Sequence, residues 1–74
     1  MIGKVKIGEK IQIKNLSKVN SLVKRRMLDF GITEGTVVSI QNIMPFSGPY
    51  ILEYEGSKVG IRRKEVQNIE VEII

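Results

Sequence analysis

The chain contains no cysteine and no histidine, and these two absences remove whole classes of site. Without cysteine there is no disulfide, no thiolate metal site and no cysteine nucleophile. Without histidine, the commonest general base and the commonest transition-metal ligand are both missing. The carboxylates and serines are scattered, with no glycine-rich phosphate loop beside them. We therefore predict no catalytic site, no metal site and no bound cofactor.

Aromatic residues and long apolar runs are also scarce. Aromatics make up only 5% of the chain, which disfavours a platform for stacking bases of single-stranded nucleic acid. No apolar run approaches the roughly 20 residues that a membrane span needs. Residues 1–10 mix charged and apolar side chains, so they do not resemble a secretory signal. We expect a cytoplasmic protein without a membrane span of its own.

The charge that is present is mostly positive, with a formal net charge of +4. Such a balance fits an ordinary basic surface. It also fits an acidic partner, which could be a nucleic acid, an anionic membrane surface or an acidic protein face. Composition alone favours the ordinary surface.

The length of 74 residues fits one domain, spanning 1–74, and its pattern is mainly that of short strands. Ile11 and Ile13 alternate with polar residues, as in a half-buried strand, and Gly8 precedes them as a turn. Further strands are predicted at 36–43, 50–54, 58–62 and 69–73. The loop 44–49, the tight turn 55–57 and one helical turn at 63–66 separate them. About five strands at such close spacing predict a small closed β-barrel, because closure removes exposed edges.

Residues 18–30 carry the spacing of an amphipathic helix inserted between the first two strands. Ser17 or Asn20 is expected to cap its start. Gly31 is expected to end it in the left-handed conformation, with Ile32 folding back on the last turn. The residues predicted to form its apolar face, at spacings of three and four, are Val19, Leu22, Val23, Met27 and Phe30.

Two residues break the helical pattern at 100° per residue. Arg26 falls inside the apolar face, and we interpret it as a side chain whose stem lies on the core edge while its head reaches a carboxylate or carbonyl. Leu28 falls on the polar face, among Lys24 and Arg25. Either the loop 45–49 covers Leu28, or Leu28 is a hydrophobic anchor for a partner, flanked by basic residues.

Four segments in this order resemble the family of ferrous iron transport protein A, FeoA. They are residues 7–10 (IGEK), 26–36 (RMLDFGITEGT), 45–49 (PFSGP) and 61–66 (IRRKEV). Together they correspond to a glycine turn, an arginine-leucine helix that ends in glycine, a proline-glycine-proline loop and an arginine-rich turn. Met27 stands where the family usually has leucine, and Val66 where it usually has alanine. The resemblance covers nearly the whole chain.

The resemblance implies an SH3-like barrel and a cytoplasmic accessory role in ferrous iron uptake. The partner that it implies is the cytoplasmic part of the FeoB-type iron transporter. Lys24, Arg25 and Leu28 are then the candidate partner-binding residues. A second interpretation is a nucleic-acid-binding barrel with residues 62–64 on phosphates, although we expect no specific nucleic acid. A third is a weak metal-sensing regulatory domain, which the missing histidine and cysteine disfavour.

Overall fold

The computed structural model describes residues 5–74. Residues 1–4, part of the segment argued not to be a secretory signal, lie outside this range. The elements are, in order, β1 (Lys10–Asn15), α1 (Ser21–Asp29), β2 (Val37–Ile43), β3 (Tyr50–Tyr54), β4 (Ser57–Ile61), α2 (Arg63–Val66) and β5 (Glu70–Ile73). All five strands form one antiparallel sheet in the order β4-β3-β2-β1-β5. The expected mainly β fold of five strands, with a helix inserted between the first two, is therefore confirmed.

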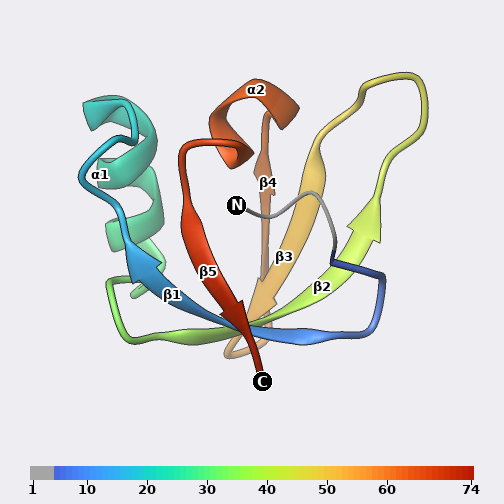
Figure 1. The fold of residues 1–74 in the computed structure, drawn as a ribbon, viewed down its shortest axis with the longest axis horizontal. Coiled ribbons are helices and arrows are strands. Elements are labelled where there is room, and N and C mark those ends of the chain that lie inside the picture. Colours follow the sequence, from blue (N-terminus) through green and yellow to red (C-terminus); the bar gives the residue numbers. More distant parts are fainter. Residues whose placement is uncertain (1–4) are drawn as a thin grey trace.

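The sheet is strongly curved, as Figure 1 shows. The register shifts by one residue between Ile13 and Asn15 in the β1–β5 ladder, and between Ile40 and Asn42 in the β2–β3 ladder. Such bulges bend a strand and increase its twist. Across residues 5–74, however, β4 and β5 form no ladder with each other and remain the two edges of the sheet. The expectation of a closed barrel is therefore wrong: the sheet curves without closing by backbone pairing.

The core lies on the inner side of the curved sheet. Buried and exposed side chains alternate along the strands, so one face of the sheet supplies the core. Ile11 and Ile13 of β1 are fully buried, while their neighbours Lys10 and Lys14 are exposed. Among the described residues, no polar or charged side chain is buried. The buried core consists of Val5, Ile11, Ile13, Leu16, Val19, Met27, Ile32, Val38, Ile40, Tyr50, Leu52, Val59, Ile61, Val66 and Ile69.

Both helices and the loop between β2 and β3 project beyond the strands. In Figure 1 the start of α1, the short helix α2 and this loop all reach the upper end of the sheet. The β3–β4 turn and the connection from α1 to β2 lie at the opposite end. The fold therefore gathers its two helices and its proline-rich loop at one end.

Candidate partner-binding surface

The helix α1 is shorter than the sequence predicts, because Asn20 caps it. The Asn20 side chain accepts a hydrogen bond from the Leu22 N–H at 2.8 Å, so the helix begins at Ser21 and not at residue 18. Of the two caps considered, Asn20 is the correct one. At the other end Gly31 has φ of +85°, and the Ile32 N–H donates to the Met27 carbonyl at 2.9 Å. This confirms the predicted glycine stop and the fold-back of Ile32.

Only a narrow stripe of α1 is in the core. Met27 is fully buried and Val23 is half-buried against the same cluster. Leu22 and Phe30, predicted to share that apolar face, are 79% and 40% exposed. The prediction is wrong for these two residues. Leu22 lies in the first turn of the helix and Phe30 follows its last residue, whereas Val23 and Met27 are the helical residues that pack against the core. Most of the helix surface is therefore free for contacts with a partner.

Leu28 lies on this free surface, with 54% of its area exposed. It borders a shallow groove of about 370 Å³ whose lining is Leu16, Lys24, Leu28, Ile32, Thr33 and Glu34. No residue of the loop 45–49 lines this groove, so the alternative in which that loop covers Leu28 is wrong. Besides Lys24 and Leu28, its lining comes from Leu16, before the helix, and from residues 32–34, just after it. An apolar side chain of a partner could fit between Leu28 and this segment.

The two basic candidates differ in their surroundings. Lys24 lines the Leu28 groove, whereas Arg25 forms an ion pair with Asp29 one turn later, at 3.6 Å. Both partners of that pair are well exposed, 76% and 65% of their side chains, so the pair contributes little to stability. Arg25 can therefore exchange Asp29 for a carboxylate of a partner at little cost.

Glu34 also lines this groove, and its role there is not visible in the sequence pattern. Its carboxylate accepts a hydrogen bond from the Leu16 N–H at 2.9 Å and so joins the end of β1 to the segment after α1. A long-range bond between a side chain and the backbone leaves no periodic signal, so the spacing of residues could not have revealed it. Glu34 adds one negative charge to the groove that Lys24 also lines.

Arg26 is exposed rather than seated on the core edge. It lines a second groove of about 340 Å³ between α1 and α2. Within residues 5–74 its guanidinium has no hydrogen bond or ion pair, so the predicted carboxylate or carbonyl partner is not found. The interpretation of Arg26 as a snorkelling side chain is therefore wrong. The reason is that Met27 and Val23 are the residues of α1 that face the core, which leaves Arg26 at the exposed side of the helix.

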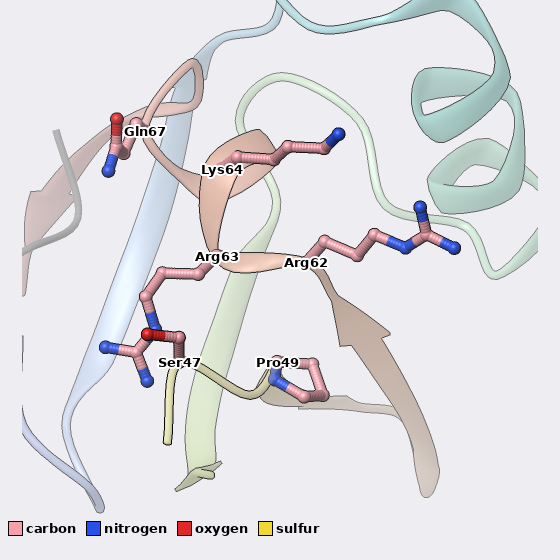
Figure 2. A pocket seen from close by; sticks show the side chains of 6 residues that line it. All are labelled: Ser47, Pro49, Arg62, Arg63, Lys64 and Gln67. Atoms are coloured by element: carbon pink, nitrogen blue, oxygen red, sulfur yellow. The ribbon is translucent and has the colours of Figure 1, made fainter. Parts of the chain in front are cut away.

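The three basic side chains of residues 62–64 point in different directions and differ in their partners. Arg63 donates to the carbonyls of Met44 and Gly48 at 2.8 and 3.3 Å, and its guanidinium lies 5.2 Å from the centre of the Tyr50 ring. Figure 2 shows Arg63 turned toward Ser47, while Arg62 and Lys64 point the other way. Among residues 5–74, Arg62 and Lys64 have no such partner, so only these two of the three cations are available to contact a nucleic acid phosphate.

Over residues 5–74, no three side chains of the carboxylate, imidazole or thiol type come together where they could hold a metal ion. Neither described helix is long and apolar enough to cross a membrane.

Comparison with known proteins agrees with this fold and these segments. A family model described as "FeoA domain" matches residues 2–73. The solution structure of the FeoA protein from Chlorobium tepidum superimposes with a TM-score of 0.86 at 23% identity, over 99% of this chain and 69% of that one. A FeoA-like protein from Clostridium acetobutylicum gives a TM-score of 0.76 at 29% identity, over 99% and 84%. No protein of curated function matches significantly in sequence.

The family match spans almost the whole chain, and the fold is shared with both solved structures. The FeoA family consists of small accessory domains associated with ferrous iron transport, and it is not a known enzyme family. The resemblance noted from four short segments is thereby confirmed. This chain belongs to the FeoA domain family.

Proposed function

We propose that the protein is a cytoplasmic accessory factor of ferrous iron uptake that binds the cytoplasmic part of a FeoB-type transporter. It acts by binding and not by catalysis. The observation that carries the proposal is Leu28, an exposed leucine of α1 beside a groove that is lined by both apolar and charged side chains. Membership of the FeoA family supports a role in ferrous iron transport, and the groove is the surface at which we propose the contact.

The contact proposed here has an apolar centre and a charged rim. Leu28 is the anchor, and Lys24 and Arg25 pair with carboxylates of the transporter domain. Such a combination is typical of protein interfaces, in which one desolvated apolar residue contributes most of the affinity and rim charges steer the encounter. The nucleic-acid interpretation is weaker, because Arg63 is already bound to the loop between β2 and β3.

The test is Leu28→Glu, measured with the purified cytoplasmic domain of the transporter. An exposed substitution usually changes the free energy of unfolding by less than about 0.5 kcal/mol, so the variant should still fold. Loss of a central anchor costs about 2 kcal/mol or more of binding, which is a reduction in affinity of at least about thirty-fold. The matched control is Leu22→Glu, which makes the same change on another face of the same helix.

We expect Leu28→Glu to lose binding while Leu22→Glu retains it, with both variants folded. Lys24→Gln should mainly slow association and weaken its salt dependence, because rim charges act on the encounter. A folded Leu28→Glu variant that binds as well as the original chain would refute the proposed surface. Equal losses in both leucine variants would do the same.

A further inference from the structure

Two apolar side chains protrude from the end of the molecule that carries the helices. Phe46, in the loop between β2 and β3, is 100% exposed, and Leu22, at the start of α1, is 79% exposed. Both elements reach the same end of the sheet, with α2 also at that end (Figure 1). Phenylalanine ordinarily packs in a core or an interface, so a fully exposed Phe46 is unusual.

The loop holds Phe46 outward in a fixed and strained conformation. Phe46 and its neighbour Ser47 both have positive φ, +58° and +62°, which few residues other than glycine adopt. Arg63 bonds to carbonyls on both sides of the pair, and the Met44 N–H donates to the Pro49 carbonyl at 3.0 Å. Backbone strain of this kind persists only where the surrounding contacts enforce it. The exposure of Phe46 is therefore built into the loop.

The surface between these two apolar tips is basic. Two hollows of about 430 and 340 Å³ lie on either side of α2. Their charged lining residues are four cations, Arg26, Arg62, Arg63 and Lys64, and one carboxylate, Glu65. The β3–β4 turn, which contains Glu55, lies at the opposite end of the sheet. Positive charge and protruding apolar groups thus occur together at one end.

We propose that this end of the molecule binds the surface of an anionic lipid bilayer. Phe46 and Leu22 enter the boundary between headgroups and acyl chains, while Arg62 and Lys64 contact lipid phosphates. Amphipathic surfaces hold to membranes in this way, by apolar area together with attraction to anionic lipids. A bilayer is flat and needs no preformed pockets, so it can receive protruding groups from separate elements at once. A protein partner would need a matching pocket for each.

This surface is separate from the one proposed for the transporter. Leu22 and Leu28 are six residues apart, which places them about 120° apart around the helix. The groove beside Leu28 and the hollows beside α2 share no lining residue. Membrane binding and transporter binding can therefore be tested independently.

The test is sedimentation of the full chain with vesicles of phosphatidylcholine, with and without phosphatidylglycerol. We expect binding only when phosphatidylglycerol is present, and weaker binding as salt is raised. The double variant Arg62→Gln/Lys64→Gln should lose about five-fold for each cation, or about 25-fold in total. The matched control Lys10→Gln/Lys58→Gln removes the same charge from exposed positions on β1 and β4, outside this surface, and should change binding by less than about three-fold.

The apolar contribution is tested at Phe46. Phe46→Asn keeps a residue that tolerates positive φ, so the loop conformation should survive while the apolar tip is lost. We expect at least a ten-fold reduction in vesicle binding. Because the chain has no tryptophan, Phe46→Trp also places a single reporter at the tip. Its emission should shift to the blue with anionic vesicles, whereas the control Val37→Trp at the start of β2 should not shift.

Three results would overturn the proposal. They are no binding to anionic vesicles, equal binding to neutral and anionic vesicles, and a folded Phe46→Asn variant that binds as the original chain does. A further outcome is that the Phe46 and Arg62/Lys64 variants lose affinity for the soluble transporter domain and none of the proteins binds vesicles. That result would also reject the membrane and assign this end to a protein partner.

Discussion

The Nη2 of Arg63 donates a hydrogen bond to the carbonyl of Met44 across 2.8 Å, joining the start of α2 to the end of β2. A second bond, from Nε to the Gly48 carbonyl at 3.3 Å, reaches the other side of the same loop. One guanidinium therefore fixes both arms of the loop, and it does so beside the Tyr50 ring. Arginine suits this role because its planar fork holds several donors in fixed directions.

Replacement of Arg63 by lysine should loosen the loop. Lysine retains the charge but cannot place two directed donors on two carbonyls. A hydrogen bond from a charged group contributes about 1.5–3 kcal/mol when it is well shielded, and Arg63 is partly exposed, so we expect a loss of about 1–2 kcal/mol. In a domain of this size, that lowers the melting temperature by about 5–10 °C. Arg62→Lys, at the exposed neighbour, is the control and should leave the melt unchanged. Equal melts for the two variants would contradict the assigned role.

Gly31→Val should destabilise the protein because Gly31 has φ of +85°, where a β-branched residue is strained. An added Cβ would lie 3.4 Å from the Tyr54 ring, which is an ordinary van der Waals contact, so the expected cost comes from the backbone conformation. We expect a loss of about 1–2 kcal/mol or more, seen as a lower melting temperature. Gly31→Asn should cost less, since asparagine adopts this conformation more readily. If valine and asparagine melted alike, backbone strain would not be the cause.

Asn20→Ala should weaken the start of α1. The substitution removes the acceptor for the Leu22 N–H and should cost about 0.5–2 kcal/mol of the free energy of unfolding. Asn20→Ser keeps a capping oxygen and serves as the control. Denaturant titration of both variants measures the difference. A serine variant as unstable as the alanine variant would show that the loss of stability does not come from removing the capping oxygen.

Folding should not depend on a metal ion. Neither cysteine nor histidine is present to form a strong transition-metal site of the kind that drives the folding of small zinc domains. We expect the same melting temperature with and without a chelator. A chelator that lowered the melt by several degrees would show that a structural ion had been missed.

Much of the fold follows from local patterns, but the way the elements cover one another does not. Alternation predicted β1 correctly, and the glycine stop at Gly31 was found because its signal lies within a few residues. The prediction that Leu22 packs in the core was wrong. The spacing of residues shows which of them share a helical face, but it does not show which part of that face contacts the rest of the protein. The prediction of a closed barrel was wrong for a related reason. The curvature of a sheet depends on bulges, which the pattern of side chains did not indicate.

The candidate site was predicted in part. Leu28 was identified because an apolar residue on a polar face is visible in the sequence, and its exposure is now established. Its role in partner binding stays a prediction. Glu34 and Arg63 were missed or misread because each is defined by a backbone group distant in the sequence. Only the folded chain brings such groups together.

The order of strands has a consequence for how the chain folds. β2, β3 and β4 follow one another as hairpins, so their pairing is local and can begin with little loss of chain entropy. β5 pairs only with β1, which brings together Ile11 and Ile73 from near opposite ends of the described chain. Long-range pairing of this kind is slow to form. The three-stranded meander is therefore expected to form early, and the joining of β5 to β1 to be the late step that completes the core.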